Sequence, residues 1–166
     1  PNSMHLYPGL CLLEATNVSE GRGSDFSFET VAAPWLQTNE IVSFINQSFG
    51  DEIKASSISI TPTSGKYAQT LCKGIHFEVI DPLFYKPVFF GLLLLYIIRA
   101  KHPEAFLWAP YKTAVNPSGE NHLDKLLGVH HAEQLFDLPL PQFVATCTKI
   151  THTPNWQEQM IPYLLY

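Results

Sequence analysis

"KPVFFGLLLLYIIRAKHP", residues 86–103, contains the longest apolar run of the chain. The run from Val88 to Ile98 has eleven residues, whereas a bilayer-spanning helix needs about 20. Pro87 suits a first helical turn, Lys101 and His102 suit the negative end of the helix dipole, and Pro103 ends the helix. We therefore expect the central helix of a core, apolar on nearly every side, and no membrane span.

Other segments around this helix show both helical and extended patterns. Residues 39–49 have apolar positions at helical spacing, and residues 73–81 alternate as a half-buried strand does. We expect further extended segments at 6–13, 28–36, 56–63, 106–108 and 143–148, and short helices at 122–128, 131–136 and 154–161. Because no strict β-α-β rhythm appears, we predict a single α+β domain, in which a mixed sheet packs against the central helix and several shorter ones.

The composition limits the classes of function. The chain has 166 residues, 46% of them hydrophobic and 15% charged, with a net charge of -5. This describes one folded domain without the basic cluster that nucleic acids or anionic membranes require, so we expect no nucleic-acid partner. We expect no cofactor and no metal, since the pair His130 and His131 lacks further ligands at zinc spacing.

The three cysteines, Cys11, Cys72 and Cys147, are far apart and odd in number. They form no C-x-x-C motif. We interpret them as small buried hydrophobes, and the sequence leaves open a disulfide between two of them.

A polar loop stands out at residues 11–29, "CLLEATNVSEGRGSDFSFE". An apolar run ends on Glu14, and Gly21 and Gly23 flank Arg22, which permits a tightly curled backbone. Carboxylates can accept from sugar hydroxyls or transfer protons, and a guanidinium offers a planar fork to a carboxylate or phosphate. The loop therefore suggests one wall of a substrate cleft.

The candidate site residues come from this loop and from the end of the strand at 73–81. The auxiliary catalytic candidates are Glu14 and Glu20. The substrate-binding candidates are Asn17, Ser19, Gly21, Arg22, Gly23 and Asp81.

A purely structural interpretation is equally open. Arg22 would then pair with Glu14 or Asp25, Asn17 and Ser19 would bond the turn, and Asp81 would cap the turn before Pro82.

The loop resembles the E-G-T-N-x-S-x-G-R-G-T signature of the exo-β-N-acetylmuramidase family NamZ. Similarity continues at "AAPW" (32–35), "KYAQTLCKGIHFEVID" (66–81), "PVFFGLLLL" (87–95) and "LDKLLG" (123–128). Ala15 and Ala32 replace glycines of the family pattern, and Ser24 replaces a threonine.

The resemblance implies that residues 1–166 are the smaller C-terminal domain of a two-domain enzyme. Because the chain begins at Pro1 rather than at a methionine, we also expect a piece of a longer protein. The implied enzyme is a glycoside hydrolase that releases terminal N-acetylmuramic acid from the non-reducing end of peptidoglycan fragments. Its main catalytic acid would lie on an N-terminal Rossmann-like domain, and its substrate cleft would lie between the two domains. The implied partners are that domain and a peptidoglycan-derived glycan, and the implied location is periplasmic or secreted.

Within this resemblance we expect Arg22 to meet the lactyl carboxylate of muramic acid, and Glu14 or Glu20 to assist as the second carboxyl group. We expect this chain by itself to be inactive. The alternatives are a non-catalytic carbohydrate-binding or interaction domain, and a structural domain whose loop only packs against its neighbour.

Overall fold

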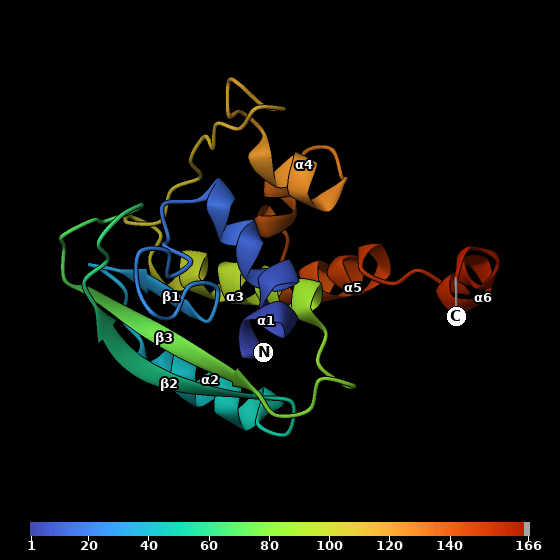
Figure 1. Cartoon of the computed structure of the whole chain (residues 1–166), viewed down its shortest axis with the longest axis horizontal. Coiled ribbons are helices and arrows are strands. Elements are labelled where there is room, and N and C mark those ends of the chain that lie inside the picture. The colour runs from blue at the N-terminus through green and yellow to red at the C-terminus, as the bar shows by residue number, and fades with distance from the viewer. Residues whose placement is uncertain (165–166) are drawn as a thin grey trace.

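The computed structural model describes residues 1–164 and has the predicted α+β class (Figure 1). Its elements, in chain order, are α1 (Asn2–Leu10), η1 (Cys11–Ala15), β1 (Thr30–Ala33), α2 (Asn39–Phe49), β2 (Ile53–Ile60), β3 (Cys72–Val79), α3 (Pro87–Lys101), α4 (His122–Leu127), η2 (Ala132–Asp137), α5 (Leu140–Ile150), α6 (Trp156–Met160) and η3 (Ile161–Tyr163). The elements labelled η are 3₁₀ helices. Among residues 1–164, no helix combines the length and apolarity needed to cross a membrane.

Helix α3 is the central helix that its sequence predicts. Pro87 opens it, and Leu92, Leu94, Leu95 and Ile98 are buried. Figure 1 shows the sheet and α2 on one side of α3 and α4 on the other. Burial on both sides explains the run of leucines, because a helix with neighbours on both sides has little polar surface to present.

The sheet is small and antiparallel throughout, in the order β1-β3-β2, rather than mixed as expected. Ile75 and Phe77 of β3 face the main core, which they share with Ile41 and Ile45 of α2. The opposite face carries a separate small cluster, Ala32, Ile60 and Cys72, against which Phe26, Ile58 and Tyr67 pack.

The first segment of the chain is a helix, and the predicted strand at 6–13 is wrong. Leu6, Gly9 and Leu10 are its buried residues, at helical spacing. Gly9 is decisive, because a Cβ there would lie 2.1 Å from the carbonyl oxygen of Pro87, and one at Gly91 would lie 2.3 Å from that of Gly9. The pair Pro8-Gly9, which suggests a helix breaker, thus permits the backbones of α1 and α3 to touch.

The extended segment predicted at 143–148 is also wrong, because these residues belong to α5. Phe143 and Cys147, four residues apart, are its buried side chains, which is helical spacing. Within 106–108, only Trp108 pairs in a strand-like manner, through an isolated bridge to Thr16. The remaining predicted segments contain β1, α2, α4 and α6, and they overlap β2, β3 and η2 with shifted ends.

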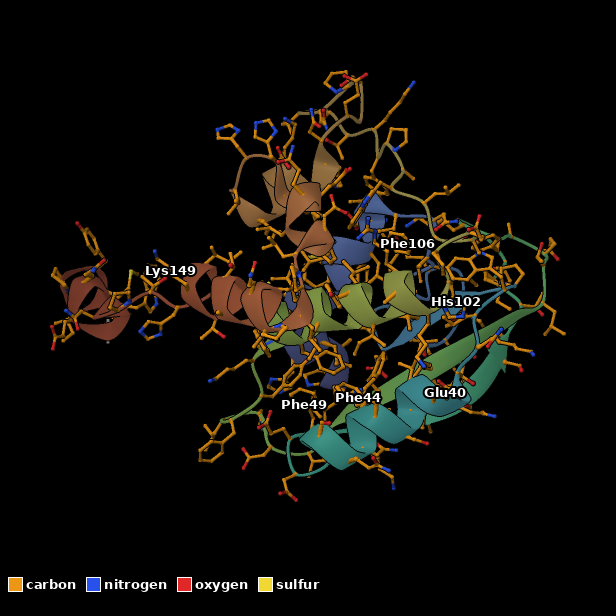
Figure 2. All side chains as sticks on the ribbon, turned by 180° about the vertical axis from the view of Figure 1, so that it is seen from behind. Glu40, Phe44, Phe49, His102, Phe106 and Lys149 are labelled. Carbon is orange, nitrogen blue, oxygen red and sulfur yellow. The ribbon has the colours of Figure 1, made fainter. Side chains whose placement is uncertain are left out.

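Buried His102 joins the end of α3 to the connection between β1 and α2. Its Nε2 accepts from the backbone N–H of Gln37 at 3.0 Å, and its Nδ1 lies 3.0 Å from the oxygen of Ile98. Figure 2 shows His102 beyond the end of α2 that carries Glu40, away from Phe49 at the other end. His102 therefore has a structural role, and its Nδ1 carries the proton that is donated to Ile98.

Candidate functional site

The polar loop begins in η1 and returns along β1. Glu14 lies within η1, and Ser19 forms a reciprocal backbone bridge with Ala32 of β1, at 2.8 and 2.9 Å. Gly21 and Gly23 both have φ of +80°. A Cβ on Gly23 would lie 2.5 Å from the oxygen of Ser64. The tight turn expected from the two glycines is therefore confirmed, although a short helix rather than a strand leads into it.

Arg22 lies between the two carboxylates of the loop. Its Nη2 donates to Oε1 of Glu14, and its Nε lies 3.3 Å from Oε1 of Glu20. Glu14 and Glu20 are only 8% and 3% exposed. The alternative in which Arg22 pairs with Glu14 thus describes the observed contacts, and neither carboxylate forms an exposed wall.

Lys66 is the second cation of the cluster, and sequence reasoning did not identify it. Its Nζ donates to the backbone oxygens of Leu13 and Val18, at 2.8 and 2.9 Å, and to Oε2 of Glu20 at 3.3 Å. An ammonium has three N–H donors, so all three have a protein acceptor. Burial lowers the pKa of Lys66, against the opposing effect of Glu20. Lys66 therefore links the start of the loop to its middle.

The guanidinium of Arg22 is stacked as well as paired. It lies 4.9 Å from the ring centre of Phe28 and 5.9 Å from that of Tyr111, whose hydroxyl accepts from Nη1. Although burial opposes its charge, the Tyr111 hydrogen bond and the two glutamates raise the pKa of Arg22. Its side chain is nevertheless 39% exposed. Arg22 is thus a fixed cation that solvent can reach.

Buried His122, the first residue of α4, lies behind this cluster. Its ring centre is 4.8 Å from that of Tyr111, and its Nε2 is 3.5 Å from Oε2 of Glu14. This distance permits an ion pair, but the geometry is not that of a hydrogen bond. Neither ring nitrogen has a hydrogen-bond partner among residues 1–164. Tyr111 and His122 come from segments that no local motif marks.

Two of the predicted binding residues have structural contacts instead. The hydroxyl of Ser19 accepts from the N–H of Gly21 at 3.2 Å, which matches the alternative in which this side chain bonds the turn. Asn17 does not bond its own turn. It donates to the oxygen of Ala105 at 2.8 Å and accepts from the N–H of Leu107 at 3.0 Å, so it fixes the loop to a distant segment of the chain.

Asp81 is not brought to the cluster. It lies beyond the C-terminal end of β3, whereas Lys66 precedes its start, and eight strand residues separate the two ends. At about 3.3 Å per residue this is roughly 26 Å. The carboxylate of Asp81 accepts from the N–H of Leu83 at 2.9 Å, which is the capping role given as its alternative.

The other candidate groups add no chemistry to the cluster. Cys11, Cys72 and Cys147 are free thiols, and burial together with nearby Glu14 raises the pKa of Cys11 to about 11. No group of three or more metal-ligating side chains occurs in the described part of the chain.

The fold and this cluster define an α+β domain whose buried charges converge on one accessible arginine. The chain belongs to the family described as exo-beta-N-acetylmuramidase NamZ, C-terminal, which matches residues 5–166. The resemblance seen in the sequence is confirmed.

One relative and one solved structure illustrate the similarity. The chain is 35% identical over 104 residues to the peptidoglycan beta-N-acetylmuramidase NamZ of Bacillus subtilis (strain 168), which covers 63% of this chain and 25% of that protein. The crystal structure of a DUF1343 family protein from Bacteroides fragilis superimposes with a TM-score of 0.71, at 15% identity, over 98% of this chain and 41% of that one. The second match supports the fold alone, and in both the chain spans less than half of the similar protein.

Proposed function

We propose that this chain is the C-terminal part of a peptidoglycan glycoside hydrolase that releases terminal N-acetylmuramic acid from the non-reducing end. Family membership supports the class of reaction. In this proposal the main catalytic acid lies on an N-terminal Rossmann-like domain, and Arg22 faces the cleft between the domains. The parent protein would act outside the cytoplasmic membrane, where peptidoglycan lies.

The observation that supports this proposal most is the state of Arg22. A guanidinium has five N–H donors, of which two hydrogen-bond Glu14 and Tyr111. The Nε–H lies beside Glu20 in an ion pair. One N–H on each of Nη1 and Nη2 is therefore left over from these three contacts. A partly exposed guanidinium that is already oriented, with two donors to spare, suits a bidentate bond to a carboxylate.

The lactyl carboxylate of N-acetylmuramic acid is the group that such a site would recognise, because N-acetylglucosamine lacks it. Glu14 and Glu20 then hold Arg22 in its orientation and do not contact the sugar. Their burial against cations argues for this positioning role and against direct proton transfer in the arrangement observed.

The test is hydrolysis of a chromogenic N-acetylmuramide by this chain alone and by the chain joined to its N-terminal domain. We expect activity only from the joined protein. Arg22→Gln should lower kcat/KM for the muramide about 10- to 100-fold, as expected for a lost charge-assisted pair. The matched control is Arg99→Gln, because Arg99 is the chain's other arginine and pairs with Asp137 instead.

The second candidate is a glycan-binding domain without a catalytic role. The burial of both loop carboxylates favours it, since neither is exposed to a substrate. A joined protein that binds N-acetylmuramic acid but hydrolyses no muramide would establish this candidate. An unchanged kcat/KM in Arg22→Gln would remove Arg22 from recognition in both.

A further inference from the structure

Glu14 faces two different donors with its two oxygens. Oε1 accepts from Nη2 of Arg22, whereas Oε2 lies 3.5 Å from Nε2 of His122, just outside a good hydrogen bond. Glu14 therefore forms a hydrogen bond with Arg22 and none with His122. A movement of Oε2 by less than about 1 Å would complete the His122 contact, because N–H···O bonds are about 2.9 Å long, and a larger turn of the carboxylate would also release Nη2 of Arg22.

The unmade contact is unusual because His122 is buried. Only 7% of the residue is exposed, and both ring nitrogens lack a hydrogen-bond partner in the described part of the chain. Burying an unpaired polar group costs free energy, so such groups in folded proteins call for an explanation. One such explanation is a hydrogen-bond partner that reaches His122 only in another state of the site.

His122 also contacts the other side of the Arg22 site. Its ring stacks on Tyr111, whose hydroxyl accepts from Nη1 of Arg22. Helix α4 packs directly on η1, which carries Glu14. One imidazole therefore adjoins two of the three groups that hold Arg22.

We propose that His122 is a positioning residue that accepts Glu14 from Arg22 when a ligand carboxylate binds. The incoming carboxylate binds the unused donors of Arg22 and displaces Glu14 from Nη2, Glu14 turns to the Nε2–H of His122, and Tyr111 keeps its contacts with Arg22 and with the imidazole. No covalent bond changes, and one hydrogen bond replaces another. The exchange spares Glu14 the cost of a buried carboxylate that has lost its cation.

This inference rests on the proposed recognition of a carboxylate by Arg22. It adds that the affinity of the site depends on a group that never touches the ligand. One substitution separates carboxylate recognition by Arg22 from the exchange at His122. His122→Phe keeps a ring for Tyr111 to stack on but removes the Nε2–H donor.

The direct experiment is NMR of the 166-residue chain labelled with ¹⁵N-histidine, titrated with N-acetylmuramic acid and with N-acetylglucosamine. We expect the Nε2 resonance of His122 to shift with the first sugar only, and the shift to disappear in Arg22→Gln. An Nε2 resonance that stays in place throughout the muramic acid titration would overturn the exchange.

Affinity for N-acetylmuramic acid provides the second measurement. We expect His122→Phe to weaken binding about tenfold, the equivalent of one hydrogen bond to a charged group. His122→Gln, whose amide can still donate, should recover part of the loss, and His130→Phe, which changes an exposed histidine, should have no effect. Circular dichroism checks that each variant is folded.

The outcomes distinguish the two levels of the argument. If Arg22→Gln binds N-acetylmuramic acid as well as the wild type, carboxylate recognition by Arg22 is wrong and the exchange is wrong with it. If Arg22→Gln weakens binding but His122→Phe does not, recognition stands and only the exchange is refuted.

Discussion

Replacing Lys66 by methionine tests whether one ammonium holds the polar loop in place. Methionine keeps much of the stem but leaves the backbone oxygen of Val18 without its donor and Glu20 without one of its two cations. The oxygen of Leu13 loses one donor but still accepts from the N–H and the hydroxyl of Thr16. An unpaired buried acceptor costs about 1–3 kcal/mol. Lys66 is 22% exposed, so water relieves part of this cost.

We therefore expect a loss of about 2 kcal/mol in the free energy of unfolding, from the unpaired oxygen of Val18 plus a weakened ion pair at Glu20. For a chain of this length that corresponds to a fall of roughly 4–8 °C in Tm. Urea unfolding followed by the fluorescence of half-buried Trp35 and Trp108 gives the free energy, provided that the m-value is unchanged.

The matched control is Lys54→Met, because Lys54 is exposed on β2. This change should stay within about 0.5 kcal/mol of the wild type, as surface substitutions usually do. A Lys66→Met protein less than about 1 kcal/mol below Lys54→Met would refute the reasoning, since the loop would then need no ammonium.

Three further predictions follow from the packing and burial of single residues. Gly91→Ala should destabilise the chain by about 3 kcal/mol or more, because its Cβ meets the Gly9 oxygen. Gly128→Ala, with φ of +66° but open space around it, should cost only about 1 kcal/mol. If Gly128→Ala unfolded at a lower temperature than Gly91→Ala, the close helix crossing would be contradicted. Asn17→Ala should cost about 2 kcal/mol in the urea assay, because it bridges two backbone groups; unaltered stability would instead mark Asn17 as free for a ligand. Burial raises the pKa of Cys147 from 9.0 to about 11, so the unfolded chain releases this proton first as the pH rises. The free energy of unfolding should therefore fall between pH 9 and 11 by at most about 2.7 kcal/mol. A Cys147→Ala variant whose free energy of unfolding falls equally over this pH range would show that another group is responsible.

The elements with one clear period could be predicted from the sequence. Helix α2 and strand β3 have apolar positions that fit one geometry, and Gly50 follows α2 as expected. Helix α3 has no such period, and it could be predicted from the length of its apolar run and from the prolines at its two ends. The segment at 6–13 could not be assigned in this way, because Pro8 and Gly9 suggest a break. The reason for Gly9 lies about eighty residues away, at Gly91.

The candidate site shows the same limit. The loop itself could be predicted, because Glu14, Gly21, Arg22 and Gly23 lie close together in the chain. Lys66, Tyr111 and His122 could not, since they reach the cluster only through tertiary packing. Lys66 begins the segment 66–81 that resembles the family, but nothing in that segment indicates that its ammonium reaches the loop. The burial of Glu14 and Glu20 was also out of reach, because a carboxylate in a polar loop gives no sign of how deeply it will be enclosed.

The crossing at Gly9 and Gly91 has a consequence for protein engineering. Only four residues separate Gly9 from Glu14, so the root of the loop is anchored to the close crossing of α1 and α3. Residues between Glu20 and Phe28 could therefore be exchanged for sequences of other specificity without moving that root, if the acceptors of Lys66 are kept. The domain would then serve as a scaffold for grafted anion receptors, in which a new recognition segment inherits its orientation from a helix pair that it never contacts.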